Sequence, residues 1–283
     1  MNEPALDGKI VIVIVTGGGV GLGRVMALGL AARGARVAIM DINRETANAV
    51  AAEIEAASGA GAAIAIGGSI AIEADCASAV AETRDAFGGP HVLINNAALG
   101  MRLVSEDFVT DPPKFWDCPP EIFQAFLDTN IGGPFLMARA VVPHMIARGW
   151  GRIVNVTTSL DSMMRGGNMP YGQAKAAVEG ASASWAGDLA GTGVTVNVLI
   201  PGGAADTAMI PDHAPFERSA LNPPSVMVAP VCWLASDASD GVTGRRFIGA
   251  DWNPDLPDAE AARAAGAPAA WAALKRKAPR ILP

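Results

Sequence analysis

The sequence is poor in the residue types that build disulfide frameworks and metal sites. Its 283 residues include only three cysteines and three histidines, all far apart in the chain. Neither a disulfide framework nor a cluster of metal ligands is therefore predicted, and an odd number of scattered cysteines is typical of the reducing cytoplasm. We expect a cytoplasmic protein without a bound metal.

Long apolar runs and basic patches are also missing. A run such as Ile10 to Val15 is far shorter than the ~18 residues that a membrane-spanning helix needs. The opening MNEPALDGK has no basic segment followed by an apolar stretch, so we expect no secretory signal. The net charge is -7 and the only basic cluster lies near the tail, over 275–280, so no nucleic-acid partner is expected either.

What the sequence does have is a regular alternation of short β-branched runs with longer alanine-rich stretches at helical period. The runs begin at Lys9, Arg36, Ala62, Val92, Arg152, Val194 and Arg245. This alternation predicts an α/β fold, a single doubly wound Rossmann-type domain whose parallel sheet of about seven strands has helices on both faces. The domain is expected to span residues 1–254. A C-terminal extension over 255–283 is expected either to cover a pocket or a neighbouring subunit, or to form a loose tail.

Two segments, 99–120 and 202–224, break this alternation. Both are irregular and contain several prolines, and both follow predicted strands. They are therefore expected at the carboxyl edge of the sheet, where ligands bind in such folds, as substrate loops. Apolar side chains in and near them predict an apolar pocket, formed by Phe115, Trp116, Met163, Met164, Met209 and Phe216.

A glycine-rich segment, TGGGVGLG over 16–23, separates the first predicted strand from the first predicted helix. Its glycines allow a tight turn and a close approach to a ligand, and the amino end of the helix favours a pyrophosphate. Asp41 ends the next strand, where a carboxylate can accept hydrogen bonds from ribose hydroxyls and repel a 2′-phosphate. With Val20 in place of a basic residue, NAD is favoured over NADP. Arg44 is the residue that could favour a phosphate.

The only tyrosine, Tyr171, lies in the segment YGQAK. On a helix, Tyr171 and Lys175 are one turn apart and share a face. A phenol has an ordinary pKa near 10, and an ammonium about 4 Å away could lower that pKa toward neutrality. Tyr171 would then be a competent general base for an alcohol proton, and a general acid in the reverse direction.

Together these motifs resemble the short-chain dehydrogenase/reductase family, over nearly the whole chain to about Pro254. The features stand in the family's order: TGGGVGLG, Asp41, NNAA at 95–98, Asn130, the hydroxyl cluster TTS at 157–159, YGQAK and PGGAADTAM. The resemblance implies that Tyr171 is the acid/base, that Lys175 lowers its pKa and holds the nicotinamide ribose, and that Asn130 positions a water in a proton relay. It implies cofactor contacts from Gly17, Gly19, Val20, Gly21, Leu22, Asp41, Ser69, Ile70, Asn96, Ala97, Tyr171, Lys175, Pro201, Gly202 and Thr207.

The sequence departs from the family pattern at several positions. The position of the family's catalytic serine holds Thr158 here, which the ungapped spacing favours as the catalytic hydroxyl; Ser159 is the alternative. Ala98 replaces the glycine of the NNAG segment, and Ser69 stands where an aspartate often meets the adenine. One additional residue precedes Thr207, which leaves its assignment open.

The expected activity is hydride transfer between a nicotinamide cofactor, NAD, and a secondary alcohol or ketone that is apolar and cyclic or aromatic. An NADPH-dependent carbonyl reductase is the alternative on the same scaffold, and a nucleotide-sensing protein without turnover ranks behind both. A cofactor-independent lyase or dehalogenase would not need the glycine-rich segment, which is present. By family analogy the protein would be a homotetramer, with helices over 123–139 and 171–189 forming one interface.

Overall fold

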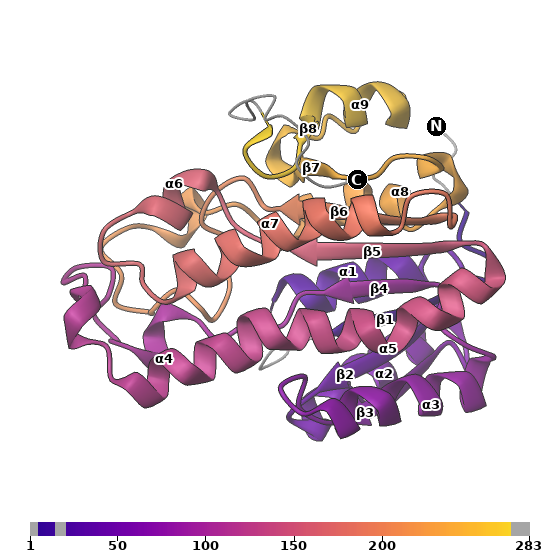
Figure 1. Ribbon diagram of the computed structural model, residues 1–283, viewed down its shortest axis with the longest axis horizontal. Coiled ribbons are helices and arrows are strands. Elements are labelled where there is room, and N and C mark those ends of the chain that lie inside the picture. The colour runs from indigo at the N-terminus through magenta and orange to yellow at the C-terminus, as the bar shows by residue number, and fades with distance from the viewer. Residues whose placement is uncertain (1–4, 15–20, 273–283) are drawn as a thin grey trace, which may run out of the picture.

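A computed structural model describes residues 5–14 and 21–272 of the chain, and its centre is a single sheet (Figure 1). The strand order is β3-β2-β1-β4-β5-β6-β7-β8. All seven predicted strands are present and run parallel to one another. They are β1 (Ile10–Ile14), β2 (Arg36–Asp41), β3 (Ala63–Gly67), β4 (Val92–Asn95), β5 (Gly151–Val156), β6 (Val194–Ile200) and β7 (Arg245–Ile248).

Helices cover both faces of this sheet, which confirms the doubly wound α/β fold. On one face lie α1 (Leu22–Ala31), α2 (Arg44–Ser58) and α8 (Val228–Leu234), and on the other lie α3 (Glu73–Phe87), α5 (Gly133–Arg148) and α7 (Tyr171–Asp188). Every residue of β4 and β6 is buried, as expected for parallel strands with helices on both faces. No helix in the described part of the chain is long and apolar enough to cross a membrane.

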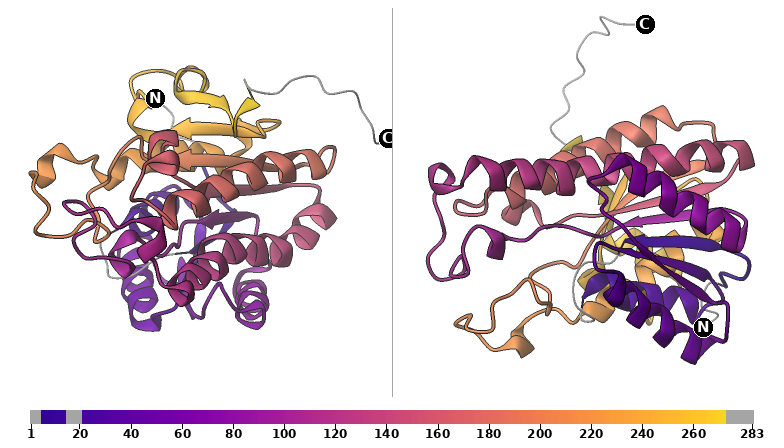
Figure 2. Two further views of the ribbon diagram at one scale, coloured as in Figure 1. Left: turned by 60° about the vertical axis from the view of Figure 1, so that its left-hand side comes forward. Right: turned by 90° about the horizontal axis from the view of Figure 1, so that it is seen from below.

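The strand order reverses between β1 and β4, and this point defines the ligand-binding edge of a doubly wound sheet. Both irregular segments lie at this carboxyl edge, projecting from one end of the molecule (Figure 2, right). Segment 99–120 contains the short turns η1 (Met101–Leu103) and η2 (Phe115–Asp117), and segment 202–224 contains η4 (Arg218–Ala220). Arg102 Nη1 donates to the Ala208 carbonyl at 2.8 Å, so the two segments are joined directly.

The sheet has one strand that the sequence did not predict. Strand β8 (Gly266–Pro268) pairs antiparallel with β7, so the sheet has eight strands rather than about seven. It follows helix α9 (Asp258–Ala265), whose buried alanines join the core beside Trp252. As far as residue 272, therefore, the segment after residue 254 packs on the domain and extends its sheet.

Candidate active site

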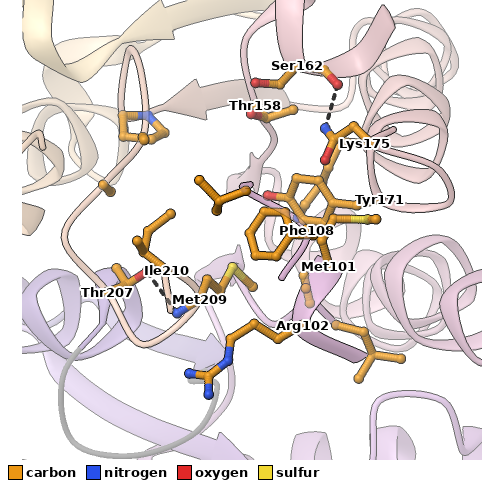
Figure 3. A pocket seen from close by; sticks show the side chains of 18 of the residues that line it. Met101, Arg102, Phe108, Thr158, Ser162, Tyr171, Lys175, Thr207, Met209 and Ile210 are labelled. Carbon is orange, nitrogen blue, oxygen red and sulfur yellow. Dashed lines mark hydrogen bonds between the residues drawn. The ribbon is translucent and has the colours of Figure 1, made fainter. Parts of the chain in front are cut away.

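A cavity of about 700 Å³ opens at the carboxyl edge of the sheet (Figure 3). Its wall is built from the amino end of α1, the chain after β4, β5 and β6, the first turn of α7, and both irregular segments. Of the predicted site residues, those that line it are Gly21, Leu22, Asn96, Thr158, Tyr171, Lys175, Pro201 and Thr207. The topology therefore brings together residues from the whole length of the chain.

Tyr171 is the first residue of α7, and Lys175 lies one turn later on the same helix. The Lys175 Nζ is 5.9 Å from the centre of the Tyr171 ring. The ammonium is buried and donates a hydrogen bond of 2.8 Å to the Val156 carbonyl at the end of β5. This bond fixes the first turn of α7 against the strand that leads to Thr158.

The titration of this pair differs from the simple expectation. Burial raises the pKa of Tyr171 to about 12 and lowers the pKa of Lys175 to about 8. In the polypeptide alone the cost of desolvating a phenolate exceeds the attraction of this ammonium, so Lys175 by itself does not lower the pKa of the phenol. A second positive charge in the cavity would favour loss of the Tyr171 proton.

The structure distinguishes between the two candidates for the catalytic hydroxyl, Thr158 and Ser159. Thr158 lines the cavity, whereas Ser159 does not. Ser159 is the N-cap of helix α6 (Leu160–Met164), and its Oγ accepts a hydrogen bond from Ser162 N at 3.2 Å and contacts Ser162 Oγ at 2.9 Å. Because the Ser159 hydroxyl is engaged in capping, Thr158 is the hydroxyl available to a ligand (Figure 3).

Asn130 lies in a π-helical segment, η3 (Leu127–Gly132), a rare conformation that occurs frequently at functional sites. Its buried side chain forms two hydrogen bonds with the backbone of Leu99. Asn130 Nδ2 donates to the Leu99 carbonyl at 2.9 Å, and Leu99 N donates to Asn130 Oδ1 at 2.7 Å. The side chain fixes the start of segment 99–120 and does not line the cavity. A water held by Asn130 would therefore have to bind its backbone.

The residues expected to hold the adenosine half of a cofactor lie at the same carboxyl edge of the sheet. Asp41 ends β2, buried to 2% exposure, and its Oδ1 accepts a hydrogen bond from Asn43 N at 2.8 Å. Gly21 is the N-cap of α1, whose first turn carries no acidic residue, so its amino end can receive an anion. This combination of a carboxylate and a helix amino end suits a ribose and a pyrophosphate. Gly17, Gly19 and Val20 lie outside the described residues.

The remaining residues predicted to contact the cofactor are Ser69, Ile70, Ala97 and Gly202. Ser69 Oγ accepts a hydrogen bond from Ala71 N at 3.3 Å, and Ser69 N donates to Asp75 Oδ2 at 2.8 Å. Ile70 and Ala97 are buried in the core on the α3/α5 face. Gly202 has a φ of +100°, and a Cβ there would lie 2.8 Å from the Ala250 Cβ, so its role is to permit the turn after β6.

The apolar lining was only partly predicted. Met209 and Phe216 line the cavity as expected, but Phe115, Trp116 and Met164 point to solvent, with exposures of 65%, 69% and 70%. Met163 is buried outside the lining. In their place the chain supplies residues from the first halves of the irregular segments, namely Leu99, Met101, Leu103, Phe108, Val109 and Ile210. Irregular segments have no periodicity from which their inward side could be predicted.

Hydrogen bonds between buried polar side chains, which the sequence alone did not predict as a network, connect the elements around the cavity. Asn95 Nδ2 donates to Asn155 Oδ1 at 2.8 Å, and Asn155 Nδ2 donates to Ser182 Oγ at 2.9 Å. This network joins β4 and β5, which lead to Asn96 and Thr158, to α7, which carries Tyr171 and Lys175. Asn95 belongs to the NNAA segment that carries the family resemblance, whereas Asn155 is marked in the sequence only by its place near the end of a strand.

Comparison with known proteins places the chain among sequences and structures of one family. A model of the family described as short chain dehydrogenase matches residues 11–217. The 3-oxoacyl-[acyl-carrier-protein] reductase of Synechocystis sp. is 33% identical, with coverage of 83% of this chain and 94% of that protein. The 2,5-dichloro-2,5-cyclohexadiene-1,4-diol dehydrogenase of Sphingobium indicum is 36% identical, with coverage of 84% and 94%. The crystal structure of 3-ketoacyl-(acyl-carrier-protein) reductase from Brucella melitensis complexed with NADH superposes with a TM-score of 0.73 at 29% identity, covering 84% of this chain and 95% of that one.

Proposed function

Since the chain belongs to the short-chain dehydrogenase family, a family of oxidoreductases that use a nicotinamide cofactor, we propose that it is an NAD-dependent dehydrogenase of secondary alcohols. The observation that carries this proposal is the convergence of Tyr171, Lys175 and Thr158 on one cavity, which also receives the amino end of α1.

The roles follow from the positions of these side chains. A nicotinamide dinucleotide, when bound, would accept a hydride from the carbinol carbon of the alcohol. The alcohol oxygen would accept a hydrogen bond from the Thr158 hydroxyl and pass its proton to the Tyr171 oxygen. In the reverse direction the same two groups would donate to the oxygen of a ketone, on which negative charge develops. Lys175 would favour the phenolate of Tyr171 by its positive charge.

The preference for NAD rests on Asp41. Its carboxylate ends β2 at the edge where an adenosine ribose would lie, and it would repel a 2′-phosphate at that place. At about 4 Å and an effective dielectric constant near 20, the repulsion is up to about 4 kcal/mol for each unit charge before screening. Even half of that value exceeds a tenfold difference in affinity.

The first test is a titration of the purified protein with NADH and NADPH separately, followed by the fluorescence of its six tryptophans. NADH is expected to bind at least about tenfold more tightly than NADPH. Binding of neither nucleotide would contradict the proposed enzymatic function altogether.

An NADPH-dependent carbonyl reductase is the second candidate, and one contact favours it. Arg44 begins α2 beside Asp41 and packs over Gly67, where an added Cβ would lie 3.0 Å from the Arg44 Cβ. An exposed guanidinium there could pair with a 2′-phosphate. In the titration above, tighter binding of NADPH would decide for this candidate.

For the substrate we propose an apolar secondary alcohol, cyclic or aromatic, because many of the side chains that line the cavity are aliphatic, methionine or phenylalanine. The name of the Sphingobium relative, a dehydrogenase of a chlorinated cyclohexadiene diol, supports a ring substrate. A panel of cyclohexanol, 1-phenylethanol and cyclohexenediols, with lactate as the polar comparison, tests this class by the formation of NADH.

Because Thr158 lines the cavity whereas Ser159 caps α6, we predict different effects when each hydroxyl is removed. Thr158→Val keeps the shape of the side chain and removes the donor to the substrate oxygen, so kcat is expected to fall by about 10²-fold or more. Ser159→Ala removes the cap of α6 and is expected to cost about 1 kcal/mol of stability with kcat nearly unchanged. Steady-state kinetics and thermal unfolding of the two variants measure this difference; the opposite pattern would assign the catalytic hydroxyl to Ser159.

A further inference from the structure

Glu179 is a buried carboxylate that the proposed reaction does not use. It lies on α7 four residues after Lys175 and eight after Tyr171, so the three side chains follow one face of the helix. Its side chain is only 3% exposed, and a carboxylate in such surroundings is costly unless it is paired and hydrogen-bonded. The reason for its presence should therefore be sought in its partners.

Three residues donate hydrogen bonds to this carboxylate. Thr157 Oγ1 donates to Oε2 at 2.9 Å, and Arg246 Nη1 lies 2.8 Å from Oε1 and 2.7 Å from Oε2. The backbone N of Ala270 donates to Oε1 at 3.3 Å. The carboxylate thus joins α7 to the end of β5, to β7 and to the segment after β8.

Arg246 extends the connection to the cavity. While its Nη1 binds Glu179, its Nη2 donates to the Thr158 carbonyl at 3.0 Å. The planar guanidinium presents donors in a fixed fork, so the carboxylate and the carbonyl are held in a defined relation to each other. Neither Arg246 nor Glu179 lines the cavity, so neither can touch a substrate there.

As a result, each of the four successive residues 156–159 takes part in a hydrogen bond with a side chain outside this stretch. Lys175 Nζ binds the Val156 carbonyl, Glu179 binds the Thr157 hydroxyl, Arg246 binds the Thr158 carbonyl, and Ser162 binds the Ser159 hydroxyl. Two of these partners, Lys175 and Glu179, belong to the helix that carries Tyr171. Because a β-branched threonine has a restricted χ1 angle, fixing the Thr158 backbone also fixes the direction of its hydroxyl.

We propose that Arg246 and Glu179 are positioning residues that hold the Thr158 hydroxyl in register with Tyr171. The inference rests on the proposed function in one respect, the role of Thr158 as the donor to the substrate oxygen. The expected effect is large for residues outside the cavity, because a misplacement of about 1 Å in a catalytic group can cost ~10²-fold in rate.

The decisive variant is Arg246→Lys. Lysine keeps a positive charge for Glu179 but lacks the second arm of the fork, so the Thr158 carbonyl loses its donor. With the fastest alcohol of the panel, kcat is expected to fall by about tenfold or more, while the affinity for NADH changes by less than about twofold. The same substitution in a Thr158→Val background is expected to have almost no further effect on kcat, because no hydroxyl remains to be positioned. Equal losses of kcat in both backgrounds would overturn the proposal and indicate a purely structural role.

Arg152→Lys is the matched control. Arg152 is a buried arginine on β5, and it too binds a carboxylate, that of Asp240, and a backbone carbonyl, that of Ser236. It occupies the opposite end of the strand from Thr157 and Thr158. A loss of stability similar to that of Arg246→Lys is expected, with kcat nearly unchanged. An equal loss of kcat in both variants would overturn the proposal.

Hydrogen–deuterium exchange provides a readout that needs no substrate. Arg246→Lys is expected to increase amide exchange over residues 157–163, whereas Arg152→Lys is expected to leave that stretch unchanged. Unchanged exchange over 157–163 in Arg246→Lys would overturn the proposal even if no alcohol of the panel reacts. If exchange increases as expected but Thr158→Val retains full activity, the positioning network stands and the proposed role of Thr158 fails.

Discussion

Tyr171→Phe is expected to lower kcat for alcohol oxidation by about 10²–10⁴-fold, the contribution of general acid–base catalysis. Phenylalanine keeps the ring that fills this part of the cavity and removes only the group that takes the proton. The affinity for NADH is therefore expected to change by no more than about twofold, which serves as the control for folding. A variant that kept a third or more of the wild-type kcat would contradict the role of Tyr171.

The pH dependence provides a second readout for the same substitution. Burial raises the pKa of Tyr171 to about 12, so within the polypeptide alone the phenol holds its proton at neutral pH. Oxidation requires the phenolate, so its rate is expected to rise as the pH rises toward that value, whereas ketone reduction requires the phenol and is expected to fall only as the pH approaches it. The residual oxidation rate of Tyr171→Phe is expected to lack this rise. Parallel profiles in the wild-type protein and the variant would assign the titration to another group.

Asp41→Asn is expected to change the preference between NADH and NADPH by about 100-fold, with roughly tenfold losses for NADH and tenfold gains for NADPH. Asparagine has the size of aspartate, and its carbonyl oxygen can still accept the hydrogen bond from Asn43 N. The substitution thus removes the negative charge with little change of shape. Fluorescence titration with both nucleotides measures the change.

Asp75→Asn is a matched control for this prediction. Asp75 is another acid at the same edge of the sheet, and its Oδ2 accepts a hydrogen bond from Ser69 N at 2.8 Å. It is not at the end of β2, so its replacement is expected to affect the two nucleotides equally. A wild-type preference for NADH that survives in Asp41→Asn would show that Asp41 does not read the ribose.

Much of the fold follows from local pattern, and the exceptions are instructive. The seven parallel strands were predictable because each is a short β-branched run between helical stretches, and burial on both faces demands such runs. Strand β8 was not predictable, because Gly266–Pro268 contains two residues disfavoured in strands and forms by pairing with β7. Its conformation is imposed by the tertiary structure.

The residues of the candidate site divide in the same way, into those that local sequence predicts and those that depend on the tertiary structure. Tyr171 and Lys175 were recognisable because they are close in sequence, and Glu179 continues their four-residue spacing, so it too could have been noticed. Its partner Arg246 is 67 residues away along the chain and follows only from the order of β5, β6 and β7 in the sheet. The burial that raises the pKa of Tyr171 could not be predicted, because spacing gives the neighbouring charge but not the depth of the side chain in the fold.

Within the described residues, strand β8 also forms the border of the sheet on the β7 side. A strand at the edge of a sheet presents unpaired backbone groups that can pair with another chain, which leads to aggregation. In this protein the edge of β7 is paired with the three-residue strand β8. Pro268 of β8 has no N–H to donate to a further strand. The exposed border is thus too short to template a further strand. A chain shortened before Gly266 would leave β7 as the border and become prone to edge-to-edge self-association.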